Sequence, residues 1–273
     1  MMIDAHTHIG LKSFIVKPIS EEKLKRPAFR DPMENPLEKL IAHMDANQVA
    51  RAVTFAYPLE EVDATLANDY VLNAHRLFPA RIIPFALVGD DVETWVARGA
   101  WGFKEQDILQ TPERFDLPRA YRAIADAGLP LLIHLRSRTP TMVAERVKEI
   151  LRDAPALRVI VAHLGRNTPN TREHVEENML ALREHANVWF ETSTVRDPGM
   201  IARAIEIVGE DRVVFGSDFP FNSYQDADPL AKEIETIARA GLSPRIADKV
   251  LSQNLLACLA NAARAKEGRA QQN

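Results

Sequence analysis

The sequence predicts an α/β protein with a single (β/α)8 (TIM) barrel, and three observations carry this prediction. Eight short apolar segments alternate with longer segments that show helical periodicity. The 273 residues correspond to about 34 residues per strand–helix pair, as in barrels of this type. Several of the apolar segments are continuous, which is typical of parallel strands covered on both faces.

The expected strands follow one another along the whole chain. Continuous apolar runs occur in three of them, at 131–133, 159–161 and 213–215. The eight expected strands are 2–8, 52–57, 81–88, 102–105, 130–135, 158–164, 188–192 and 212–217.

Helical signals lie between these strands. Apolar residues recur at helical spacing at 37–44 and 143–151. Asp197 followed by Pro198 predicts an N-cap with proline in the first turn. An open, doubly wound sheet is the alternative, but it normally has a glycine-rich phosphate loop after its first strand. Because the first strand here ends in His-Thr-His at 6–8, the barrel is favoured.

One segment interrupts the alternation. Residues 10–36 follow the first strand with basic and proline-rich sequence and no clear helix. Loops of this length inside a compact domain are uncommon and often functional, so we expect the segment to cover the barrel mouth as a lid. Residues 1–264 are expected to form the barrel domain and 265–273 a polar tail.

Composition and charge narrow the function classes. The net charge of −4 gives no electrostatic basis for non-specific nucleic-acid binding. No apolar run approaches the ~18 residues of a membrane span, and no signal peptide is visible, so a cytoplasmic location is expected. The single cysteine, Cys258, cannot form an internal disulfide and is expected to be a buried thiol. The sequence leaves open whether the protein forms a homo-oligomer.

Four histidines fall at or near the ends of expected strands. His6 and His8 lie on the first strand, His134 on the fifth and His163 on the sixth. Side chains two residues apart on a strand share a face, so His6 and His8 point the same way. Two imidazoles inside a barrel suit a divalent metal better than an apolar core. Reactive groups of barrels lie at the C-terminal ends of strands, so these side chains are expected to converge.

The spacing adds Lys104 and Asp218 to this group. Lys104, His134 and His163 are 30 and 29 positions apart, one strand–helix unit each, and Asp218 lies 55 positions after His163, or two units. A carboxylate at this place must be paired, metal-bound or strongly perturbed, because burying an unpaired charge is costly. We interpret Asp218 as a metal ligand and general base, with a helix cap or turn residue as the alternative.

These residues carry a resemblance to the amidohydrolase superfamily. The motifs are Ile3-Asp4-Ala5-His6-Thr7-His8, Gly102-Phe103-Lys104, Ile133-His134, Val161-Ala162-His163-Leu164-Gly165 and Phe215-Gly216-Ser217-Asp218-Phe219-Pro220. The sequence is most similar to the amidohydrolase-related metal-dependent hydrolases, a branch that includes the aminocarboxymuconate-semialdehyde decarboxylase type. The resemblance covers the whole barrel. It departs from relatives at Gln106 and at 135–138 (Leu-Arg-Ser-Arg), which concerns the substrate more than the metal.

The resemblance implies a metal site. Residues matching His6, His8, His134 and Asp218 would be the ligands, and His163 would be a second-metal ligand or an acid–base partner. One or two divalent ions are implied; zinc suits the set of three histidines and one aspartate, with manganese as the alternative. Lys104 has three interpretations: a carboxylated lysine bridging two metals, a partner of a substrate anion, or a structural ion pair.

The expected function is metal-dependent hydrolysis of a small ester, lactone or amide. Asp218 would accept the proton of the attacking water, and His163 would stabilise or protonate the developing oxyanion. A decarboxylase on the same site is the alternative, and a barrel that binds without turnover is the third.

Three arginines at the expected barrel mouth predict an anionic substrate. Arg136, Arg138 and Arg166 follow the fifth and sixth strands within a few residues of His134 and His163. A guanidinium group binds carboxylate or phosphate through two parallel hydrogen bonds. The alternative is solvated loop residues or ion pairs with neighbouring helices.

Overall fold

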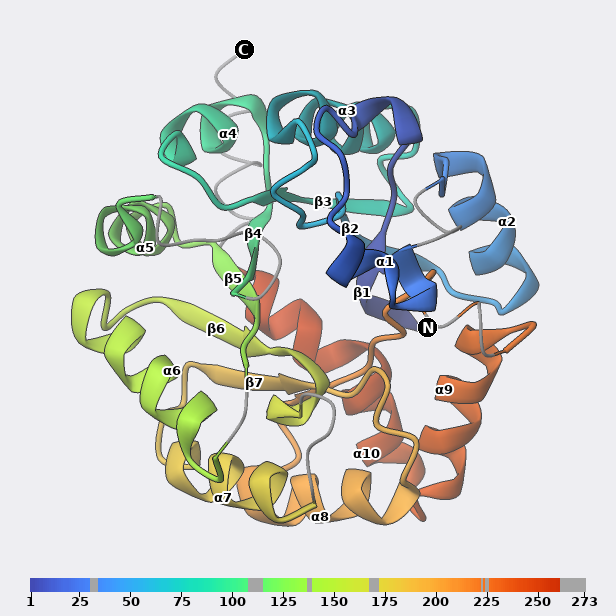
Figure 1. Cartoon of the computed structure of the whole chain (residues 1–273). Helices are drawn as coiled ribbons and strands as arrows, with labels where there is room; N and C mark the ends of the chain where they lie inside the picture. The colour runs from blue at the N-terminus through green and yellow to red at the C-terminus, as the bar shows by residue number, and fades with distance from the viewer. Residues whose placement is uncertain are drawn as a thin grey trace, which may run out of the picture.

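The computed structural model describes residues 1–29, 34–107, 115–136, 139–166, 172–221, 223 and 226–260; the predicted tail at 265–273 lies outside these ranges. Eight parallel strands pair in the order β1 to β8 and form the wall of a barrel (Figure 1), which confirms the predicted fold. The strands are β1 (Ile3–His8), β2 (Arg51–Phe55), β3 (Ile82–Leu87), β4 (Gly102–Gln106), β5 (Pro130–His134), β6 (Arg158–Val161), β7 (Val188–Glu191) and β8 (Val213–Val214).

The barrel closes between β1 and the segment that follows β8. The Ala5 amide donates to the Phe215 carbonyl at 2.9 Å, and the Asp218 amide donates to the His6 carbonyl at 2.8 Å. Since β8 is short, its continuation rather than the strand itself makes these contacts. Closure in this form brings Asp218 directly beside the histidines of β1.

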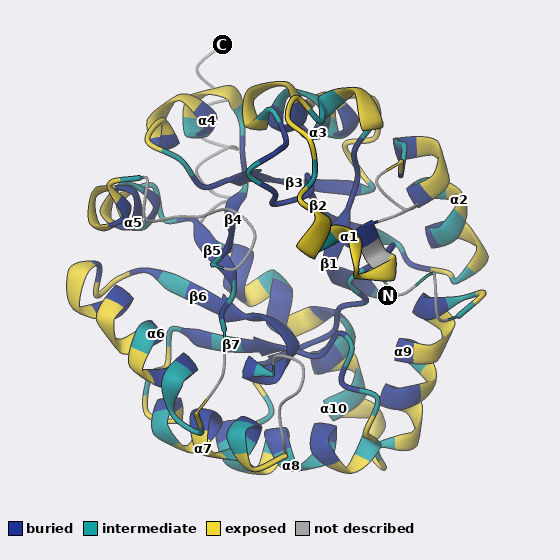
Figure 2. Cartoon of the chain, viewed as in Figure 1, coloured by how far each residue is buried: buried dark blue, intermediate teal, exposed yellow. Residues whose placement is uncertain are grey.

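Helices surround the strands, and their outer faces are exposed while the strands are buried (Figure 2). They are α1 (Glu21–Leu24), α2 (Leu37–Ala46), α3 (Ala64–Leu77), α4 (Val92–Arg98), α5 (Leu117–Asp126), α6 (Met142–Asp153), α7 (Arg172–Leu182), α8 (Pro198–Val208), α9 (Pro229–Arg239) and α10 (Pro244–Asp248). Asp197 caps α8 by accepting from the Gly199 amide, as predicted. Within the described ranges, every helix is too short or too polar to cross a membrane.

Apolar side chains form two clusters, one between strands and helices and one inside the barrel. The chain continues from α10 through a π-helical turn (Lys249–Gln253) into a helix at 254–260, drawn in red behind the strands in Figure 1. This helix contributes Leu255, Cys258 and Leu259 to the interior cluster. Cys258 is therefore the buried thiol that the sequence predicts, and burial raises its pKa to about 12.

Two strands end three residues before the positions that the sequence predicts. The expected strands at 158–164 and 212–217 are observed only as far as Val161 and Val214. His163 and Asp218 both adopt left-handed backbone conformations, with φ of 58° and 57°. Non-glycine residues adopt this conformation rarely, and when they do it is often at functional sites. The apolar run therefore extends beyond the strand in both places, because the chain turns to present the two side chains.

The segment after β1 contains three short helical turns where none was expected: η1 (Lys12–Phe14), α1 and η2 (Pro27–Phe29). Its described part lies over the β1–β2 side of the barrel in Figure 1. The Val16 amide donates to the Glu61 carbonyl at 2.9 Å, and Lys23 Nζ lies 2.7 Å from Glu61 Oε1. These contacts hold the segment against the loop that follows β2.

Candidate active site and metal centre

An irregularity in β1 turns His6 and His8 into the barrel. Ile3 and Ala5 already belong to the interior cluster, so strict alternation would direct both histidines outward. The pairing register with β2 shifts between Asp4 and Thr7. As a result both imidazoles pack on the interior side chain Phe55, with ring centroids 5.2 Å and 4.6 Å away.

Asp218 joins these two imidazoles. Its Oδ1 lies 3.2 Å from His6 Nε2 and 3.1 Å from His8 Nε2, and the three side chains form a group whose donor atoms lie within 4.8 Å of one another. Burial alone would raise the pKa of Asp218, but the charge of His6 and hydrogen bonds from both histidines hold it well below its usual value. Asp218 is therefore an ionised carboxylate at neutral pH.

Asp4 holds the turn that presents Asp218. Its carboxyl accepts hydrogen bonds from the His6 amide at 2.9 Å, from the Ser217 amide at 3.0 Å and from Ser217 Oγ at 2.5 Å. One buried side chain thus connects β1 to the segment after β8. Burial raises the pKa of Asp4 to about 7.

His134 and His163 form the other half of the site. His163 Nε2 lies 3.1 Å from His134 Nδ1, and the side-chain amide of Gln106 lies 2.9 Å from the same nitrogen. Burial lowers the pKa of His163 to about 4 and that of His134 well below its usual value, so both rings are neutral at pH 7. Of the four predicted ligands, His6, His8 and Asp218 form the compact group, whereas His134 lies against His163.

Lys104 points into the same interior. Its Nζ lies 5.1 Å from the centre of the Phe55 ring and has no hydrogen-bond partner among the described residues. Burial lowers the pKa of the amine to about 8. Within the described part of the chain, the structural ion pair that was one interpretation of Lys104 has no partner.

Two of the three predicted arginines, Arg136 and Arg166, lie near the ends of β5 and β6. The Arg136 amide donates to Asp107 Oδ2 at 2.9 Å, and the Arg166 amide donates to the His163 carbonyl at 2.8 Å. Both backbones therefore lie at the barrel mouth. Arg138 lies outside the described residues.

Sequence reasoning missed Glu191, which ends β7 inside the barrel. Its Oε2 lies 2.9 Å from His6 Nδ1, and the residue is fully buried. The spacing argument could have found it, since Glu191 lies 28 positions after His163 and 27 before Asp218. A carboxylate at the end of an otherwise apolar strand is the second signal.

Aromatic rings line one side of the histidine cluster. Tyr57 stacks on His8 with centroids 5.7 Å apart and nearly parallel rings, and Phe221 meets His8 edge-on at 4.7 Å. Phe29, from the segment after β1, contacts Phe221 at 5.8 Å. The described part of the segment after β1 thus contributes to the wall of the site.

A family model described as Amidohydrolase matches residues 3–255, from the first strand to the last described helix. The chain belongs to the amidohydrolase family. The resemblance seen in the sequence is thereby confirmed, and the protein is an enzyme of the amidohydrolase superfamily with a buried candidate metal site. A search of curated proteins gave no match.

Solved structures share the fold of this amidohydrolase. A probable 2-pyrone-4,6-dicarboxylic acid hydrolase from Acinetobacter baumannii, solved with citric acid bound, has a TM-score of 0.70 at 15% identity over 95% of this chain and 99% of that chain. A 5-carboxyvanillate decarboxylase from Sphingomonas paucimobilis has a TM-score of 0.72 at 15% identity over 95% and 98%. The corresponding enzyme from Novosphingobium aromaticivorans, complexed with manganese and 4-hydroxy-3-methoxy-5-nitrobenzoic acid, has a TM-score of 0.65 at 18% identity over 95% and 96%.

The donor set of this amidohydrolase fits a divalent cation. His6, His8 and Asp218 converge, and His134 Nε2 is a buried nitrogen without a hydrogen-bond partner in the described part of the chain. Imidazole and carboxylate together suit zinc, and they also suit manganese. A buried polar atom left unpaired is costly, so a ligand for His134 Nε2 would remove a penalty that the fold otherwise carries.

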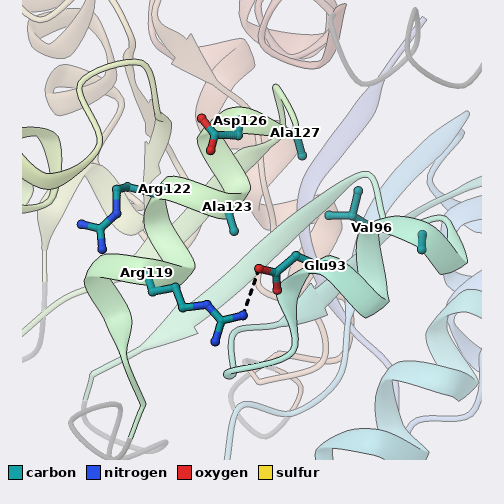
Figure 3. Close-up of a pocket in the computed structure, with 8 residues that line it drawn as sticks. Glu93, Val96, Arg119, Arg122, Ala123, Asp126 and Ala127 are labelled. Atoms are coloured by element: carbon teal, nitrogen blue, oxygen red, sulfur yellow. Dashed lines mark hydrogen bonds and ion pairs between the residues drawn. The ribbon is translucent and has the colours of Figure 1, made fainter.

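A concave region of this amidohydrolase lies outside the barrel. It has a volume of about 670 Å³ between α4 and α5, where Arg119 pairs with Glu93 at 3.2 Å across an alanine-rich floor (Figure 3). It contains none of the histidines, and it belongs to the outer helix layer rather than to the barrel mouth.

Proposed function

We propose that this amidohydrolase catalyses the metal-dependent hydrolysis of a small ester, lactone or amide. The observation that carries the proposal is the position of Asp218, an ionised carboxylate in contact with His6 Nε2 and His8 Nε2. His6, His8, Asp218 and His134 would hold the cation, with zinc first and manganese as the alternative. Such an ion supplies Lewis acidity, which polarises a carbonyl group and acidifies water.

The protein side chains divide the proton transfers. Asp218 accepts the proton of the attacking water, because it is ionised and lies among the proposed ligands. His163 is neutral at pH 7, and its Nδ1 already donates to the Ser193 carbonyl and hydroxyl, so its Nε2 can donate to a developing oxyanion only after it has taken up a proton.

Decarboxylation on the same site is the second candidate. The aromatic wall formed by Tyr57, Phe221 and Phe29 suits a planar aromatic acid, and aromatic-acid decarboxylases share the fold. We expect turnover in water labelled with oxygen-18 to place the label in the product without release of CO₂, because hydrolysis adds the oxygen of water. One CO₂ per turnover with no label in the product, measured by mass spectrometry, would instead identify a decarboxylase.

We further propose that the substrate carries an anionic group. Lys104 Nζ is a buried amine without a hydrogen-bond partner in the described ranges, and Arg136 and Arg166 lie at the mouth. Citric acid and a nitrobenzoic acid are bound by two proteins with this fold. A cation beside a divalent metal site is unfavourable unless an anion joins them, which supports an anionic substrate.

Arg136→Ala is expected to raise KM about 10- to 100-fold for an anionic substrate, since hydrogen bonds between charged groups are worth about 1.5–3 kcal/mol. The KM of its neutral ester or amide analogue should change little. The measurement is steady-state kinetics on both compounds. Arg119→Ala, outside the barrel beside Glu93, is the matched control. Equal losses for both compounds, or none, would make Arg136 structural or peripheral.

A further inference from the structure

Glu191 is surrounded by hydrogen-bond donors that occupy both of its oxygens. Oε2 accepts from His6 Nδ1 at 2.9 Å, from Ser193 Oγ at 2.9 Å and from the His163 amide at 3.3 Å. Oε1 accepts from the Ser193 amide. Glu191, His6 and His163 also form a candidate cation group. Because the carboxylate is already saturated by donors, it suits a role in orienting ligands better than a role as a ligand.

The first consequence concerns His6. A carboxylate can only accept, so His6 Nδ1 must carry the proton in this contact. The ring is then held with Nε2 toward Asp218, 3.2 Å away. Nε2 is thus the nitrogen that His6 offers to a cation.

The second consequence reaches His163 through Ser193 and concerns the His163 nitrogen that faces His134. Ser193 Oγ donates to Glu191 and therefore accepts from His163 Nδ1, 2.9 Å away. The Ser193 carbonyl, 3.1 Å from the same Nδ1, can also only accept, so this nitrogen is protonated. His163 Nε2 is consequently unprotonated, and it lies 3.1 Å from His134 Nδ1, which the Gln106 side-chain amide also approaches, at 2.9 Å. His134 Nε2 is buried and has no hydrogen-bond partner among the described residues.

We propose that Glu191 is the positioning residue of the metal centre. It holds His6 directly, with Nδ1 on its carboxylate and Nε2 directed toward Asp218 and the proposed cation, and it holds His163, which packs against His134, through Ser193. The inference rests on the proposed metal centre, and it adds the residue that orients the ligands of that centre. Gly216 supports it, because a side chain at that position would overlap the Glu191 carboxylate.

The test is the zinc affinity of metal-free protein, measured without substrate by competition with a chromophoric chelator. Glu191→Gln is expected to weaken binding about 10- to 100-fold, as removal of groups that orient metal ligands does. Ser193→Ala keeps the contact to His6 and should weaken binding less. In the Glu191→Gln background, Ser193→Ala should have almost no further effect, because the chain of hydrogen bonds is already broken.

Glu105→Gln is the matched control. Glu105 is also a fully buried carboxyl on a barrel strand, but it contacts Tyr121 at 2.8 Å on the helix side. The zinc affinity of the Glu105→Gln protein should equal that of the wild type. Additive effects of Glu191→Gln and Ser193→Ala, or equal losses in Glu105→Gln, would overturn the inference. Wild-type zinc affinity in Glu191→Gln would overturn the positioning role of Glu191 and leave the proposed metal centre intact. A wild-type protein that binds no zinc would overturn the proposed metal centre as well.

Discussion

Purified protein in which both His6 and His8 are replaced by alanine is expected to contain less than about a tenth of the wild-type metal, because a metal centre rarely survives the loss of two ligands. These two imidazoles supply two of the three side chains in the compact donor group. Catalytic activity should fall with the metal content. Elemental analysis of dialysed protein measures the first effect, and steady-state kinetics measures the second.

The fold should persist in this double variant, because neither ring is a member of the two apolar clusters that form the core. A circular dichroism spectrum like that of the wild type would show this. His174→Ala combined with His185→Ala is the control, since these histidines lie outside the barrel interior, on α7 and in the turn before β7. Undiminished, stoichiometric metal in the His6/His8 variant would remove both residues from the metal site.

Asp218→Asn is expected to lower kcat about 10²- to 10⁴-fold, the range for loss of a positioned general base. The amide can still contact His6 and His8, so part of the metal should remain bound. Because an amide cannot accept the proton of water, the loss should persist when the protein is fully loaded with metal. Activity normalised to bound metal therefore separates the loss of the base from the loss of the ligand.

The pH dependence of this variant adds a second comparison. The pKa of Asp218 is held well below 3.8, so the wild-type carboxylate is ionised throughout the neutral range. The ratio of wild-type to variant kcat should accordingly stay constant between about pH 6 and pH 8. Asp197→Asn, at the N-cap of α8, is the control. Near-wild-type turnover in metal-loaded Asp218→Asn would exclude Asp218 as the base.

The barrel could be predicted because its signal is local and repeated. Runs such as those in β5, β6 and β8 are apolar enough to identify strands covered on both faces, and their spacing predicts the order of the sheet. The ends of β6 and β8 could not be predicted from the same signal. His163 and Asp218 leave the strand conformation while the sequence around them stays apolar, since what they contact is remote in sequence.

Those residues of the candidate site that lie at the C-terminal ends of strands could be predicted from the sequence. Regular spacing identified His6, His8, His134, His163, Lys104 and Asp218 as neighbours, because parallel strands of a barrel all end at one rim. Glu191 shares this spacing but was missed, since a single acidic residue after Val-Trp-Phe resembles an ordinary strand end. The aromatic wall was missed as well, because Tyr57, Phe29 and Phe221 come from three separate segments of the chain.

The sequence by itself determined the number and order of the strands, the residues at their C-terminal ends, and the membership in the amidohydrolase family. Only the tertiary structure decided which way those residues face and what each nitrogen contacts. A period of two places His6 and His8 on one face, but the register shift in β1 is what makes that face the interior. The hydrogen bond that His6 donates to Glu191 joins residues 185 positions apart. Such contacts are set by how the closed barrel brings distant strand ends together, and local sequence carries no record of that geometry.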